Sequence, residues 1–263
     1  MAGSTQAADA ANAQVDIIGH ILDQKTLELP FVDPHHLLAG EVPLPSIEIF
    51  GIDMSITRHI VVMWVASFLL VVLMVKAFRK PDGVPSGLAN FFEAIVIFLR
   101  DEVVLPIMGE DGKKYLPFLL TIFFFVLFCN LLGLIPYSAT ATGNISVTAG
   151  LAICIFLVMI GSGMANNGFF GFFKSLIPSG VPPLLLIILI PVELISLFVK
   201  PFALCVRLFA NMVGGHVAIL VFLSLIIIMQ NEWIAIGAVP FAAAIYLLEI
   251  FVGFVQAFVF TLL

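Results

Sequence analysis

The sequence predicts an all-α polytopic membrane protein, and three observations support that prediction. Of 263 residues, 62% are hydrophobic and only 11% are charged, whereas a soluble domain has about 25% charged residues. The mean hydropathy is +1.19. From residue 115 onward, long apolar runs contain few formal charges: Lys174, Glu193, Lys200, Arg207, Glu232 and Glu249. Such a chain cannot cover a water-facing surface, so it must lie largely in lipid, which excludes a soluble enzyme.

The first 57 residues form an acidic arm. They hold eight acidic residues against a single base, Lys25. This segment lacks the basic start, compact apolar core and small-residue cleavage site of a signal peptide, so we expect it to be retained. Its charge disfavours nucleic acid as a partner.

A first span is predicted over residues 58–78. It ends among Lys76, Arg79 and Lys80, and basic residues collect on the cytoplasmic side of a membrane. The acidic arm is therefore expected outside. Residues 88–108 are apolar but include four charged side chains, which fits an interfacial helix better than a span.

Two further spans are predicted over residues 115–136 and 145–168. Lys113 and Lys114 precede the first of them, so it starts in the cytoplasm and the short polar loop after it lies outside. The second span leads to a Gly- and Phe-rich loop that carries Lys174, which returns the chain to the cytoplasm.

The stretch 183–229 allows two interpretations. A continuous helix over the 46 residues 184–229 would be about 69 Å long, whereas the hydrocarbon core is about 30 Å thick. Either two spans break near Lys200 and Pro201, or one long helix crosses at a steep tilt. A final span over 231–263 would end in the cytoplasm.

A stripe of polar groups follows one face of stretch 183–229. Glu193, Lys200 and Arg207 are spaced by seven residues, and Ser196 and Asn211 join the same face. A charge at the bilayer centre costs at least about 2.5 kcal/mol, so it faces water or a partner. Lys200 could instead snorkel to the interface. Arg207 has no acid within a turn, so its counter-charge must come from another helix or chain.

A second polar group lies off that stripe. His216 follows Arg207 by nine residues, which places it on the opposite side of the helix. Glu249 is the lone acid of the last run and shares a face with Gly253 and Gln256. A carboxylate, an imidazole and an amide on neighbouring apolar helices fit a water-lined proton path, although a packing role for His216 remains open.

Ordinary enzyme chemistry is not indicated. The sequence has no zinc-protease, nucleophile-elbow or phosphate-loop motif, and no cofactor or metal is implied. The three cysteines, Cys129, Cys154 and Cys205, lie in apolar runs without ligand spacing and are expected to be buried. A secondary ion-coupled transporter is the alternative, although no repeated halves are visible. Co-purification with a rotor ring and a stalk would discriminate the two functions.

Three motifs resemble one family. Residues 200–216 (KPFALCVRLFANMVGGH), 130–136 (NLLGLIP) and 191–196 (PVELIS) are similar to the signature of subunit a of F-type ATP synthases, the stator channel subunit of the membrane motor. The resemblance runs from about residue 50 to the end. The absence of an Arg-rich presequence favours a bacterial inner membrane over a mitochondrion.

The resemblance implies a fold and a mechanism. Residues 183–229 would be one tilted helix that forms a hairpin with the last helix against a c-subunit ring, with b-type peripheral stalk subunits as further partners. The chain would be a non-catalytic subunit. Arg207 would face each c-subunit carboxylate in turn and block a direct leak between two offset half-channels. In some bacterial members of the family the acid of the acid–base pair is on the first helix of the hairpin and the base on the second. Here the arrangement is reversed, with His216 on the first helix and Glu249 on the second.

That resemblance also assigns the remaining polar residues. Asn211 and Gln256 would lie near the arginine. Glu193 and Ser196 would line the proton path on one side of the membrane, and His216 and Glu249 the path on the other.

Overall fold

The computed structural model describes residues 26–29, 40–43, 48–49, 52–53, 55–78, 87–135, 140–176, 182–229 and 232–262. Its long helices are α3 (Arg58–Ala77), α6 (Leu116–Gly133), α7 (Ile145–Ser175), α8 (Pro183–Met229) and α9 (Glu232–Leu262). Within the described residues, these five are long and apolar enough to cross a membrane. The predicted fold class, an all-α polytopic membrane protein, is therefore confirmed.

Within the described residues of the N-terminal arm, four short strands add to the helical fold. β1 (Thr26–Leu29) pairs antiparallel with β2 (Gly40–Pro43), and β3 (Glu48–Ile49) pairs antiparallel with β4 (Ile52–Asp53). The residues of this arm predict its acidic charge but no strands. Runs of two to four residues are too short to show an alternating pattern, so they escape detection in the sequence.

A short helical segment precedes the second long helix. It comprises α4 (Leu88–Phe98), a π-helical turn (Leu99–Val104) and α5 (Leu105–Met108), followed by a 3₁₀ turn (Gly109–Lys114). Phe92, Leu99 and Val103 point into the core, whereas Arg100 and Asp101 form an exposed ion pair with Nε and Oδ1 2.7 Å apart. One apolar and one charged side suit a helix at the membrane interface.

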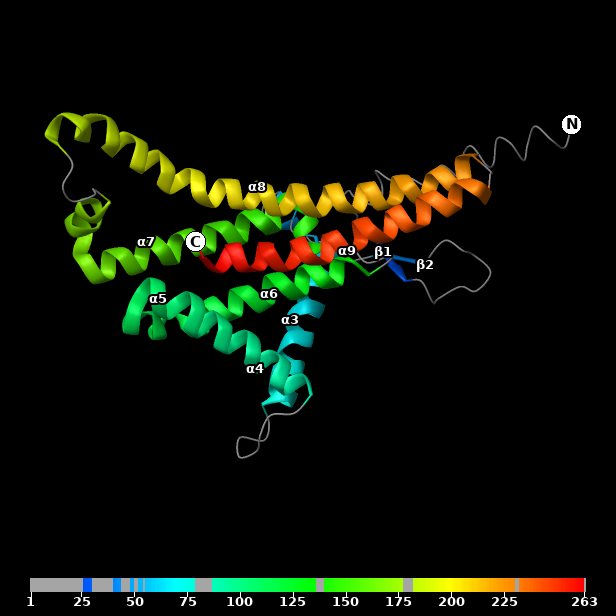
Figure 1. Ribbon diagram of the computed structural model, residues 1–263, viewed down its shortest axis with the longest axis horizontal. Coiled ribbons are helices and arrows are strands. Elements are labelled where there is room, and N and C mark those ends of the chain that lie inside the picture. Colours follow the sequence, from blue (N-terminus) through cyan, green and yellow to red (C-terminus); the bar gives the residue numbers. More distant parts are fainter. Residues whose placement is uncertain are drawn as a thin grey trace, which may run out of the picture.

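The core centres on α6, which lies between α3 and α9 (Figure 1). Of the residues of α6, 44% are buried, against 6% in the most apolar part of α8. Phe123 and Val126 of α6 are fully buried in one apolar cluster, which also contains Leu208 and Met212 of α8 and Phe260 of α9. Cys129 of α6 is fully buried in a second, smaller cluster. Helix α6 is thus the central helix, and α8 lies at the edge.

Helix α8 settles the two interpretations of the long apolar stretch. It continues without a break from Pro183 to Met229, with Pro191 and Pro201 inside it. A proline removes one backbone hydrogen bond, but ending the helix in lipid would expose several unpaired backbone groups. At about 70 Å, a helix of this length exceeds the hydrocarbon thickness more than twofold.

Helix α7 changes direction near its end. Gly168 has φ 70° and ψ 168°, which is not helical, and the chain continues as a further short helical turn. A positive φ is strained for residues with a side chain, so glycine is the residue suited to this break.

The exposure of the cysteines corrects one prediction. Cys129 and Cys205 are buried, but Cys154 on α7 is exposed. A membrane helix is apolar around its whole circumference, so an apolar run does not distinguish a buried position from one that faces lipid.

Candidate functional site

The polar residues gather on the α8–α9 hairpin. A methyl group on Gly215 would lie 2.6 Å from Cδ of Glu249, and one on Gly253 would lie 3.6 Å from Cε of Met212. These two approaches set an antiparallel register in which residue 215 faces 249 and residue 212 faces 253. Continuing that register along α9 brings Gln256 to the level of Arg207, within roughly one turn.

Arg207 lies on the side of α8 that the described chain leaves uncovered. Its side chain is exposed and forms no hydrogen bond or ion pair with any residue in the described part of the chain. Neighbours on the same side are small, since Ala210 and Gly214 follow it by three and seven residues and are both exposed. Helix α8 runs along the upper edge of Figure 1, and α7 and α9 lie below it.

Three other polar side chains point toward the packed side of the hairpin. Glu249 and Gln256 are only 3% and 5% exposed, and Asn211 is half-buried. Each has a buried atom without a hydrogen-bond partner: Oε2 of Glu249, Oε1 of Gln256 and Nδ2 of Asn211. Buried polar atoms normally have partners. A donor and two acceptors are therefore available here for water or for a transferred proton.

His216 is half-buried and lies at the level where α8 passes Glu249. It is one residue beyond Gly215, where an added methyl group would lie 2.6 Å from Cδ of Glu249. The predicted pair thus lies at one level of the hairpin. It is separated along α8 from Arg207 by nine residues, about 14 Å of helix.

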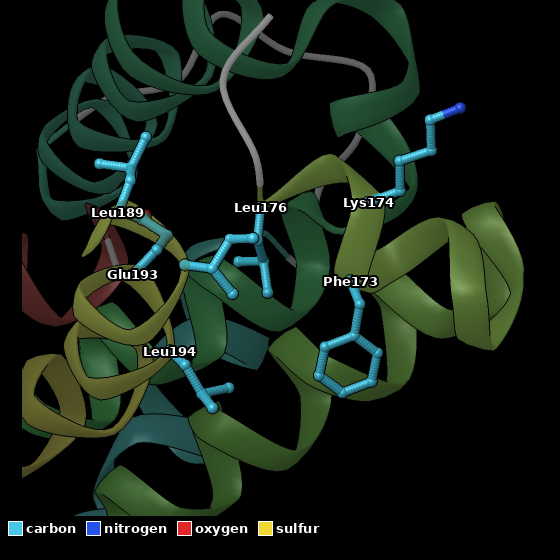
Figure 2. Close-up of a pocket in the computed structure, with 7 residues that line it drawn as sticks. Phe173, Lys174, Leu176, Leu189, Glu193 and Leu194 are labelled. Carbon is cyan, nitrogen blue, oxygen red and sulfur yellow. The ribbon is translucent and has the colours of Figure 1, made fainter. Parts of the chain in front are cut away.

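Glu193 and Ser196 lie toward the other end of α8. Both are half-buried, and Glu193 lines a cavity of about 310 Å³ between the end of α7 and the beginning of α8. Figure 2 shows this cavity, with the amine of Lys174 directed away from Glu193. The structure therefore places these two residues well away from His216 along α8 and from Glu249 beside it.

A buried hydrogen-bond network was not predicted from the sequence. Nδ2 of Asn130 in α6 donates to the carbonyl oxygen of Gly253 in α9, at 3.1 Å. Oγ1 of Thr142 donates to Oδ1 of Asn130, at 2.9 Å. Both side chains are fully buried. A lone amide in the apolar run of α6 is the sequence signal that could have indicated it.

A metal site is not formed by the described residues, where no group of three His, Cys, Asp or Glu side chains gathers.

Comparison with known proteins gives one family. The family model of the ATP synthase A chain matches residues 60–263. A protein of Chloroherpeton thalassium named ATP synthase subunit a is 48% identical over 95% of this chain and 74% of its own length. ATP synthase subunit a 2 of Chlorobaculum tepidum is 44% identical over 100% of this chain and 74% of its own. ATP synthase subunit a of Anaeromyxobacter dehalogenans is 45% identical over 94% of this chain and 67% of its own length.

Proposed function

The chain belongs to the ATP synthase A chain family. We propose that it is the stator subunit of a bacterial F-type ATP synthase, and that it carries protons through two offset half-channels to and from the carboxylates of the rotor ring. As a member of this family it is a membrane component of the synthase. In the proposal, it is non-catalytic and couples proton flow to rotation.

Arg207 is the observation that carries the proposal. A guanidinium keeps its charge at any physiological pH, so it cannot escape the cost of lipid by losing a proton. Within the described residues Arg207 has no counter-charge. An acidic group on a rotor subunit would supply one. The proposed partner is a ring of c subunits, each of which brings a carboxylate past Arg207.

The two ends of α8 support two offset half-channels. Glu193 and Ser196 would connect the ring to one side of the membrane through the cavity beside α7. His216 and Glu249 would connect it to the other side. Asn211 and Gln256, whose buried atoms lack partners, would hold water or relay protons near the arginine.

Orientation follows from the basic residues. Lys76, Lys113, Lys114 and Lys174 lie at helix ends that would face the cytoplasm. The N-terminus would then be extracytoplasmic and the C-terminus cytoplasmic, in a bacterial inner membrane. Attachment to b-type peripheral stalk subunits is proposed from family membership alone.

The test is Arg207→Ala. We expect proton-driven ATP synthesis in membrane vesicles to be abolished while the subunit still assembles, because the charge that seals the two half-channels is lost. Arg207→Lys should restore little, since lysine keeps the charge but lacks the planar, weakly hydrated fork.

Lys200→Ala is the matched control. It removes a positive charge from the same exposed side of α8, two turns away, and should leave synthesis close to normal. Near-normal synthesis in Arg207→Ala vesicles would refute the proposal. An equal loss in both variants would show that the effect is not specific to Arg207, and would contradict the role assigned to it.

A further inference from the structure

The end of α7 forms a small folded segment, which we call the α7 hook, residues 168–176. Gly168 breaks the helix with a positive φ of 70°. After the break, the ring of Phe172 packs on Gly163, where a methyl group would lie 2.6 Å from the ring. Residues nine apart in an unbroken helix lie on opposite sides. The contact therefore shows that the hook turns back against α7.

The turn presents phenylalanine rings outward. Phe172 is buried against α7, whereas Phe169, Phe170 and Phe173 are 56%, 85% and 43% exposed. Phe169 packs edge-on against both Phe170 and Phe173, with ring centroids 5.5 Å and 5.3 Å apart. The hook thus carries a preformed aromatic cluster in which Phe169 and Phe170 are the most exposed rings, while Phe173 also lines the cavity beside α8.

The position of the hook relative to the membrane follows from a contact just before it. Nδ2 of Asn166 donates to the phenol oxygen of Tyr115, at 3.1 Å. Tyr115 follows Lys113 and Lys114, which form exposed ion pairs with Glu110 and Asp111 in a polar turn. Tyrosine and lysine at the end of a span mark the membrane surface. Helix α7 therefore reaches that surface at residue 166, and the hook lies in the interfacial region.

We propose that the α7 hook is a membrane anchor that inserts its phenylalanine rings between lipids at this surface. The combination of aromatic rings and a lysine is typical of segments that lie in the interface. Lys174 is exposed, forms no ion pair within the described residues, and points its amine away from the adjoining cavity (Figure 2). It would meet the phosphate groups of anionic lipids. This anchoring role of the α7 hook is independent of the proposed proton path.

Spin labelling of the assembled complex tests the anchor. The three native cysteines are replaced by alanine, a nitroxide is attached at Phe170→Cys, and the complex is reconstituted in vesicles of phosphatidylcholine and phosphatidylglycerol. Relaxation by oxygen, which concentrates in lipid, is compared with relaxation by a water-soluble nickel chelate. Leu157→Cys on the exposed middle of α7 and Glu110→Cys in the polar turn are the matched controls.

At position 170 we expect oxygen to dominate, at a depth shallower than position 157. Dominant nickel relaxation, as expected at position 110, would show a hook in water and overturn the proposal. Protection from both reagents would overturn it too, because a protein partner would then cover the cluster.

Lys174 is tested separately through the lipid charge. A larger share of phosphatidylglycerol should deepen the label at position 170, and Lys174→Gln should abolish that shift. If the shift persists in Lys174→Gln, the assignment of Lys174 to lipid phosphate is wrong.

Discussion

Arg207 and Glu249 meet the cost of charge in lipid in different ways. A carboxyl group can become neutral by taking up a proton, so a position that is only 3% exposed is compatible with Glu249. A guanidinium has no such option and remains exposed on α8. One residue can therefore exchange a proton while the other acts as a fixed charge, which is the division of roles that the proposed channel needs.

Glu249→Gln should slow proton entry without opening a leak. The amide keeps the shape of the side chain but cannot exchange a proton. We expect the rate of ATP synthesis to fall on the order of a hundredfold, the lower end of what a positioned proton-transfer group contributes. The dependence of the rate on external pH should also change. Both are measured in vesicles, together with passive proton permeability, which should not rise.

A packing role for His216 and Glu249 makes the opposite prediction. The Gln variant would then keep its pH profile and lose stability. Cysteines at positions 216 and 249 provide an independent check, because an aqueous half-channel requires them to react with small polar thiol reagents added outside.

Gly215 should be intolerant of any side chain. A methyl group there would lie 2.6 Å from Cδ and 2.8 Å from Oε1 of Glu249, so the carboxyl group would have to move. We expect Gly215→Ala to lower ATP synthesis in the same direction as Glu249→Gln. Gly150→Ala on α7, where a methyl group meets nothing within 4 Å, is the control. Equal rates for both alanine variants would contradict a positioning effect on Glu249.

The sequence identifies the charged members of the site but not their surroundings. Arg207, Glu193 and Glu249 are conspicuous because each interrupts a long apolar run. The contact between Gly215 and Glu249 joins residues on two helices, so no local pattern indicates it. The same holds for the bond between Asn130 and Gly253, which are 123 residues apart.

At the scale of elements, polar contacts between helices fix the position of α9. Asn130 links α6 to α9, and the phenol of Tyr246 donates to the carbonyl oxygen of Leu134 at 3.0 Å. Gly253 and Tyr246 lie one turn to either side of Glu249. These bonds hold the carboxylate-bearing part of α9 against α6.

Asn130→Ala should therefore destabilise the helix packing. It removes two buried hydrogen bonds and leaves the Thr142 hydroxyl without its acceptor. We expect a loss of about 1 to 3 kcal/mol, seen as a lower apparent Tm of the purified complex in detergent. Thr142→Val removes only the second bond and should cost less. An unchanged Tm for Asn130→Ala, or a larger loss for Thr142→Val, would argue against this network as a support of α9.

Apolar length predicts where helices exist, but not every change in their course. The structure has a continuous helix through Pro201, where a break was one of two interpretations, and a break at Gly168 inside α7. Proline and glycine occur inside membrane helices and also at their ends. The backbone angles of Gly168, together with the packing of Phe172 on Gly163, show that this glycine breaks its helix.

At the scale of the whole molecule, the fold leaves one long helix open on one side. Helix α8 packs on α7 and α9, and large apolar side chains on the same side as Arg207 remain exposed, among them Leu185, Val192 and Leu225. Lipid alone could cover these. It could not match the exposed Arg207 among them, whose charge calls for a protein partner.

A density map of the intact complex in a bilayer tests the central claim most directly. We predict a ring of helices along the uncovered side of α8, with a carboxylate of one of them within about 4 Å of the Arg207 guanidinium. A map in which lipid or an apolar subunit surface faces Arg207, with the ring elsewhere, would contradict it.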